Sequence, residues 1–177
     1  TFPAYYDGLR PDEATLTAQL ASGELIDDRR LQRSLGDQIP RVAVITPYYK
    51  EPLAQLQQCH QSVLAQSEPC LHVLVSDGHP RPRLNKWNAE HVRLPRSHRD
   101  IGSTPRLIGC YHAIGLGVDA VAFLDADNWY GPNHIADLLA AMDEKNADFV
   151  SSGRTLCRLD GSEMGACPLT DPERFID

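Results

Sequence analysis

Short apolar runs alternate with longer amphipathic stretches from residue 41 onward. The runs at 42–46, 71–75 and 121–124 consist mainly of β-branched and other apolar side chains, and they end at proline or polar residues. Runs of this length and composition are typical of β-strands that are buried on both faces. The shorter run at 92–94 predicts another strand, and a last strand is expected around residues 149–151.

Helical periodicity fills the gaps between these runs. It predicts helices over residues 51–66 and 104–115. A third helix is expected after Pro132, a residue that the first helical position tolerates, because apolar side chains recur there at helical spacing: Ile135, Leu138, Leu139 and Met142. Strands that alternate with helices form mostly parallel sheets with helices on both faces. The pattern therefore predicts an α/β fold.

The first forty residues differ from the rest, since they are polar and rich in Asp, Arg and Gln. We expect a helix after Pro11 and a second one at 27–35. The chain begins with Thr1 instead of Met, which favours a piece of a longer protein. The expected division is a short helical N-terminal segment or linker at 1–40, the α/β domain at 41–155, and a loop-rich region at 156–177.

Charge is distributed unevenly along the 177 residues, whose formal net charge is -7. Residues 81–106 contain seven basic and two acidic side chains, so this segment carries +5 and the remainder carries -12. Binding to nucleic acid needs positive charge over a broad face, so no nucleic-acid partner is expected. No stretch of 18 residues lacks a charged side chain, so no membrane-spanning helix is expected either.

The five cysteines are widely spaced and form no CxxC pair, which argues against a disulfide scaffold or a structural zinc site. We therefore expect reduced thiols and a cytoplasmic location. The seven histidines show no HxxxH or HExxH spacing, so a zinc site built on them is not expected. His79 and His98 lie in the basic loops and are the two histidines that merit a test.

Candidate chemistry lies where the predicted strands end, because ligands of open α/β sheets bind at the carboxyl ends of the strands. Asp77 follows one strand, and Asp125 and Asp127 follow another. In extended backbone, two residues that are two positions apart project to the same side, and two carboxylates there favour a divalent ion with oxygen ligands. The alternative is a polar turn in which Asp127 or Asn128 caps the next helix. No glycine-rich phosphate loop is present.

These segments together resemble the family-2 glycosyltransferases of the GT-A fold. The similarity covers about residues 41–155 and includes the first strand with Pro47 and Tyr49, the strand that ends at Asp77, and the Asp125-Ala126-Asp127-Asn128 element. The segment 100–106 is similar to that family's N-x-G element and arginine-containing helix start, with Asp100 in place of the common Asn. The resemblance implies a Rossmann-like, nucleotide-binding half-sheet.

The resemblance also implies roles for individual residues. Pro47 and Tyr49 would lie beside the base, Glu51 near the ribose or base, and Asp77 would accept a hydrogen bond from a uracil-type ring. At the other end, Asp125 would approach the ribose and diphosphate, Arg106 would stabilise the diphosphate, and Asp127 would ligate Mn²⁺ or Mg²⁺.

By the same resemblance, the reaction is the metal-dependent, inverting transfer of a sugar from a nucleotide diphosphate sugar, UDP-linked, to an acceptor hydroxyl. The acceptor is not identified. Only 50 residues follow Asp127 (177 - 127), and none of their carboxylates matches a motif, so no catalytic base is assigned. The region 156–177 is then the start of a truncated acceptor region. Two alternatives stay open: a non-catalytic α/β nucleotide-binding or scaffolding module, and a nucleotidyltransferase.

Overall fold

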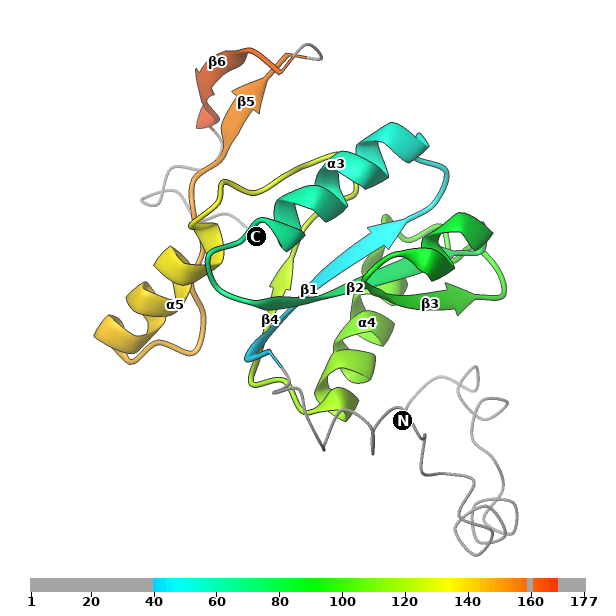
Figure 1. Ribbon diagram of the computed structural model, residues 1–177, viewed down its shortest axis with the longest axis horizontal. Helices are drawn as coiled ribbons and strands as arrows, with labels where there is room; N and C mark the ends of the chain where they lie inside the picture. Colours follow the sequence, from blue (N-terminus) through cyan, green and yellow to red (C-terminus); the bar gives the residue numbers. More distant parts are fainter. Residues whose placement is uncertain (1–39, 159–160, 169–177) are drawn as a thin grey trace, which may run out of the picture.

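The structure, a computed structural model, describes residues 40–158 and 161–168 and is built on a parallel β-sheet (Figure 1). Four strands pair side by side in the order β3-β2-β1-β4, and every pairing is parallel. Their bounds are β1 Val42–Tyr48, β2 Cys70–Asp77, β3 Glu90–Leu94 and β4 Ala120–Phe123. The four predicted strands at 42–46, 71–75, 92–94 and 121–124 are confirmed within a few residues, and so is the α/β class.

Helices cover both faces of this sheet, as the alternation of the sequence predicts (Figure 1). They are α3 Leu53–Leu64, α4 Ser103–Leu116 and α5 His134–Lys145, with a 3₁₀ helix, η2 Pro82–Lys86, between β2 and β3. Successive side chains of a strand point to opposite faces. Val42 and Val44 accordingly pack with α3 and α5, whereas Ala43 and Ile45 pack with α4.

Close packing of α4 on the sheet depends on a glycine. A Cβ atom at Gly109 would lie 2.5 Å from Cγ2 of Ile45 and 3.0 Å from Cγ2 of Val75, so any side chain there would push the helix away. This approach brings the first turn of α4 to the carboxyl edge of the sheet, where Pro105 is buried and Arg106 faces the strand ends.

The last predicted strand is wrong. Residues 149–151 form no strand, and the chain instead makes an antiparallel pair, β5 Thr155–Cys157 with β6 Glu163–Ala166, that projects from the sheet (Figure 1). Only two apolar residues stand at 149–150 before Ser151, and Phe149 is 69 % exposed, so the run is too short to bury a strand. Pro132 also differs from the expectation, because α5 begins two residues later at His134.

The expected helices after Pro11 and at 27–35 lie outside the described residues. The division at residues 40 and 155 stays a prediction.

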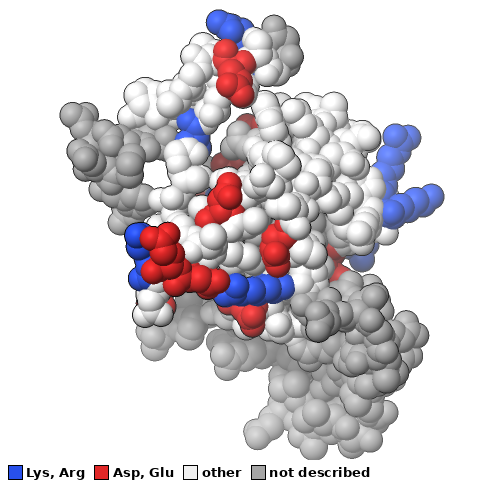
Figure 2. Space-filling view, turned by 60° about the vertical axis from the view of Figure 1, so that its left-hand side comes forward, with Lys and Arg blue, Asp and Glu red and all other residues white. Residues whose placement is uncertain are grey.

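Among the residues that the structure describes, no helix is both long and apolar enough to cross a bilayer. On the face shown in Figure 2, acidic side chains gather near the middle and several basic ones project from the right-hand margin.

Candidate functional site

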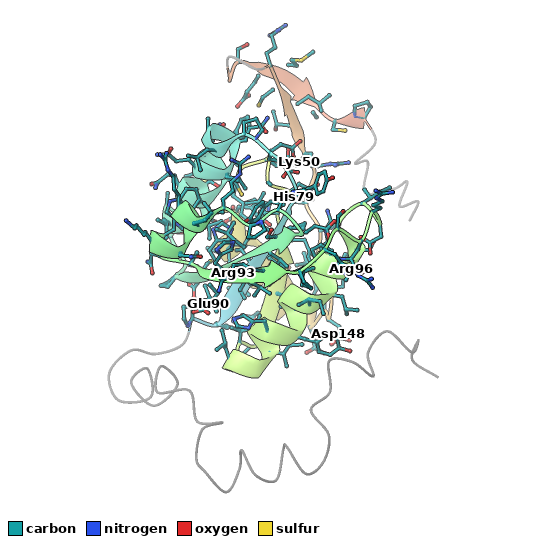
Figure 3. All side chains as sticks on the ribbon, turned by 90° about the vertical axis from the view of Figure 1, so that its right-hand side faces the viewer. Lys50, His79, Glu90, Arg93, Arg96 and Asp148 are labelled. Carbon is teal, nitrogen blue, oxygen red and sulfur yellow. The ribbon has the colours of Figure 1, made fainter. Side chains whose placement is uncertain are left out.

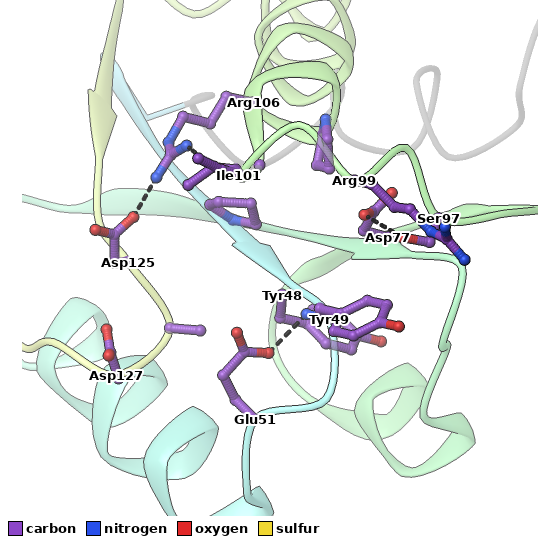
Figure 4. A pocket seen from close by; sticks show the side chains of 14 residues that line it. Tyr48, Tyr49, Glu51, Asp77, Ser97, Arg99, Ile101, Arg106, Asp125 and Asp127 are labelled. Carbon is purple, nitrogen blue, oxygen red and sulfur yellow. Dashed lines mark hydrogen bonds and ion pairs between the residues drawn. The ribbon is translucent and has the colours of Figure 1, made fainter.

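The carboxyl ends of β1, β2 and β4 and the segment before α4 surround a pocket of about 450 Å³ (Figure 4). This volume is within the usual range for sites that bind small molecules. All seven residues for which the sequence predicts nucleotide or metal contacts line it: Pro47, Tyr49, Glu51, Asp77, Arg106, Asp125 and Asp127. The structure therefore brings together residues that are up to eighty positions apart (127 - 47).

Asp77 lies at one end of the pocket, 7 % exposed at the end of β2 (Figure 4). Its Oδ1 accepts hydrogen bonds from the backbone N–H of His98 at 2.9 Å and from Nδ1 of His98 at 2.8 Å, and its Oδ2 accepts one from the Ser97 hydroxyl at 3.0 Å. Burial works to raise the pKa of Asp77, but these hydrogen bonds outweigh it and hold the pKa below its usual value. The carboxylate is therefore ionised at neutral pH.

The acidic pair lies at the other end of the pocket (Figure 4). Arg106 in the first turn of α4 donates to Oδ1 of Asp125 and also to the carbonyl oxygen of Ile101 at 2.8 Å. The guanidinium therefore spans from the loop before α4 to the end of β4. Since the Asp125 side chain keeps half of its surface exposed, a ligand can reach this ion pair.

Asp127 is exposed and, within the described residues, forms no hydrogen bond or ion pair. No group of three or more His, Cys, Asp or Glu side chains in the described part of the chain could enclose a metal ion. Magnesium and manganese ions, however, are commonly held by one or two carboxylates and complete their coordination with water and substrate phosphates. Asp127 beside Asp125 fits such an ion when a diphosphate supplies further oxygen ligands.

Tyr49 and Glu51 form the lip of the pocket beyond the end of β1. The carboxylate of Glu51 accepts a hydrogen bond from the backbone N–H of Tyr49 at 2.6 Å, which fixes the turn. The Tyr49 ring is 39 % exposed and meets the ring of His79 edge-on at 4.6 Å between centroids, with Nζ of Lys50 4.9 Å from the Tyr49 centroid. Figure 3 shows Lys50 and His79 near each other. This exposed aromatic surface can stack on a flat ligand.

The neighbouring Tyr48 is buried and has a different task. Its hydroxyl lies 2.7 Å from Nε2 of His91 and accepts a hydrogen bond from the backbone N–H of Arg81 at 3.1 Å. The guanidinium of Arg81 in turn donates to the carbonyl oxygen of Glu51 at 2.6 Å. Tyr48 and Arg81 therefore tie the loop after β2 to the lip that carries Tyr49.

Sequence reasoning did not assign pocket roles to Ser97, Arg99 or Ile101, which line the wall opposite the lip. Arg99 and Ile101 have left-handed backbone, with φ of 56° and 57°. Asp100 between them accepts a hydrogen bond from the backbone N–H of Thr104 at 2.8 Å and so fixes the start of α4. Two signals pointed to this segment, its positive charge and the similarity of residues 100–106 to the family's N-x-G element, but a loop conformation of this kind leaves no periodic pattern in the sequence.

Comparison with known proteins places most of the chain in one family model. The family described as "Glycosyl transferase family 2" matches residues 43–173. No curated protein matches the chain significantly.

Two solved structures resemble this fold. The crystal structure of S. aureus TarS is 22 % identical and superposes with a TM-score of 0.51, over 66 % of this chain and 21 % of that chain. The mannosyltransferase PcManGT from Pyrobaculum calidifontis, solved with GDP-Man and Mn²⁺, is 17 % identical with a TM-score of 0.40, over 81 % of this chain and 45 % of that chain. The described chain thus spans less than half the length of either protein.

Proposed function

This chain belongs to glycosyl transferase family 2, a family of enzymes that transfer sugars from nucleotide sugars, and we propose that its pocket binds the nucleotide diphosphate part of the donor. The observation that carries the proposal is the arrangement of Asp77, Arg106 and Asp127. A recessed acceptor lies at one end of the pocket, while a cation and an exposed carboxylate lie at the other. A nucleoside diphosphate has the matching order of base, ribose and diphosphate.

Arg106 is placed to serve the diphosphate. Its guanidinium forms an ion pair with Asp125. Guanidinium groups bind phosphate oxygens through two parallel N–H donors, so an arriving diphosphate can share this cation with Asp125. Asp125 is then available to the ribose or to a cation.

The exposed carboxylate of Asp127, with Asp125 beside it, would hold Mg²⁺ or Mn²⁺. Such an ion offsets the negative charge that develops on a departing diphosphate. Tyr49 would stack on the base, with Pro47 beside it, and Glu51 would support the turn that carries Tyr49. Asp77 would accept a hydrogen bond from the edge of the base.

We further propose a UDP-linked donor and inverting transfer to an acceptor hydroxyl. Inversion requires a general base on the face opposite the leaving group, and no described residue is assigned to that task. A cytoplasmic site of action is proposed from the five cysteines, none of which is paired in a disulfide.

Calorimetry tests the proposal directly. Titration of UDP into the full chain with MnCl₂ present should release heat, and Asp127→Asn should weaken the manganese-dependent binding about tenfold or more, because one anionic ligand is lost. Asp148→Asn is the matched control, since Asp148 is exposed and lies outside the pocket lining. Equal binding by the wild-type chain and Asp127→Asn would contradict the metal role, and no heat with either would contradict nucleotide binding.

A further inference from the structure

Two neighbouring residues hold the Asp77 carboxylate in place, although neither belongs to the strand that carries it. Both acceptor positions of Oδ1 are taken by His98, through its backbone N–H at 2.9 Å and its ring Nδ1 at 2.8 Å. Oδ2 accepts from the Ser97 hydroxyl at 3.0 Å and, at the longer distance of 3.2 Å, shares the His98 backbone N–H. An ionised carboxylate offers about four acceptor positions, so one on Oδ2 remains.

A glycine makes this arrangement possible. Gly78 follows Asp77 with φ of 78°, and a Cβ atom there would lie 2.3 Å from the backbone nitrogen of Ser97 and 2.5 Å from the carbonyl carbon of Arg96. The backbone of residues 96–98 therefore crosses directly over the end of β2. The His98 ring is also almost enclosed, with its side chain 11 % exposed, so its donor is fixed in direction.

The chemistry of the remaining acceptor restricts the base edge that can bind. Because Asp77 is ionised, it can accept hydrogen bonds but cannot donate one. On the pairing edges of cytosine and adenine, the amino donor stands next to a ring nitrogen that is an acceptor, and this nitrogen would face the carboxylate unfavourably. Uracil presents one ring N–H between two carbonyl groups, whereas guanine presents a ring N–H and an amino group side by side, which suit two free carboxylate oxygens.

We propose that His98 and Ser97 determine base specificity, because they occupy all but one acceptor position of Asp77 and so favour a base with a single ring N–H, uracil, over guanine. His98 is a positioning residue, and Ser97 lines the pocket together with Asp77. This inference rests on the proposed function, since it presupposes that a nucleotide binds in the pocket with its base at Asp77.

The test measures the affinities of UDP and GDP for the full chain with MnCl₂, and compares the ratio of the two dissociation constants between variants. His98→Leu and Ser97→Ala each free an acceptor position on Asp77, so each should shift the ratio toward GDP by about tenfold, the value of one hydrogen bond to a charged group. His98→Asn should keep the wild-type ratio, because its side-chain amide can donate from nearly the same place as Nδ1. Ser67→Ala, at an exposed position away from the pocket, is the matched control.

A merely structural role for these residues would weaken both nucleotides equally and leave the ratio unchanged. The proposal is overturned if the ratio is unchanged in both His98→Leu and Ser97→Ala, or if the wild-type chain prefers GDP. Should His98→Leu fail to fold, as judged by circular dichroism, Ser97→Ala alone decides the matter. Absence of binding of either nucleotide to the wild-type chain would instead overturn the proposed function itself.

Discussion

At the scale of single residues, two glycines of this chain differ sharply in what their missing side chain allows. Gly78 has left-handed backbone, and residues 96–98 pass against it. Gly115 lies in α4, and a Cβ atom there would have no neighbour within 4 Å. The first glycine is required by the geometry of the pocket, whereas the second only weakens its helix, since glycine is a poor helix former.

Substitution of these two glycines by alanine should therefore have opposite effects. Gly78→Ala should lower the free energy of unfolding by at least about 1 kcal/mol from the left-handed backbone alone, and further through the clash with the backbone of Ser97. Gly115→Ala should raise it by up to about 1 kcal/mol. Urea denaturation of both variants measures the difference, and a similar change in both would contradict the role given to Gly78.

At the scale of elements, a glutamine in the turn after α3 connects that helix to α5. Nε2 of Gln66 donates to the carbonyl oxygens of Gly131 at 2.7 Å and Ser62 at 2.9 Å, and its Oε1 accepts from the backbone N–H of Ile135 at 3.0 Å. The side chain of Asn133 does not cap α5. Gln66 therefore replaces the local cap, and it fixes the loop that follows Asp125 and Asp127.

Removal of the Gln66 hydrogen bonds should lower the free energy of unfolding by about as much as the loss of a helix cap does. Gln66→Leu is expected to lower the free energy of unfolding by about 1–2 kcal/mol, because the Ile135 N–H and the Gly131 carbonyl group lose their partner. Gln66→Glu loses the donor to the Gly131 and Ser62 carbonyl groups but keeps the acceptor for the Ile135 N–H and adds a negative charge at the start of α5, so it should lower the free energy of unfolding less than Gln66→Leu does. Thermal denaturation compares the two, and an equal loss in both would argue against the capping role.

At the scale of the whole molecule, a buried polar cluster joins α3 to the centre of the sheet. His60 of α3 and His72 of β2 face each other with 2.8 Å between their Nδ1 atoms, and Nε2 of His72 lies 3.0 Å from the hydroxyl of Thr46 on β1. Trp87 stacks on the His60 ring, with 4.7 Å between the ring centroids. Burial lowers the pKa of both histidines, and burial together with the neighbouring His60 lowers that of His72 to about 3.

This cluster should make the whole fold sensitive to acid. In the unfolded chain a histidine binds its proton near pH 6.5, whereas His72 in the folded chain stays neutral until about pH 3. The unfolded state therefore binds more protons between these values, so stability is complete above pH 6.5 and falls as the pH falls. At pH 5 His72 alone should cost about 2 kcal/mol.

Urea denaturation at pH 7.5 and pH 5.0 measures this loss. His72→Leu lacks the titrating group, so it should be less stable than the wild-type chain at pH 7.5 but should lose less stability on acidification. The same loss in both proteins would show that the acid sensitivity has another source.

Local patterns were sufficient for the four strands of the parallel sheet and the helices between them. Val42 and Val44 alternate with Ala43 and Ile45, and strands of this kind are recognisable because each side chain is buried by one of two helix layers. The two apolar residues at 149–150 are too few to be buried between helix layers in this way, and the strand predicted around residues 149–151 does not form. Asp77, Asp125 and Asp127 were found because they follow directly on such strands. The roles of Pro47, Tyr49, Glu51 and Arg106 came instead from the resemblance to a known family.

The sequence by itself determined which residues stand at the strand ends, since strand length and helix period depend on near neighbours. Only the tertiary structure decided what those residues contact. The crossing of residues 96–98 over Gly78, the pairing of Arg106 with Asp125, and the engagement of Asp77 by His98 join segments about twenty positions apart. Such contacts depend on how two loops meet at one edge of the sheet, and no period in the sequence encodes that meeting.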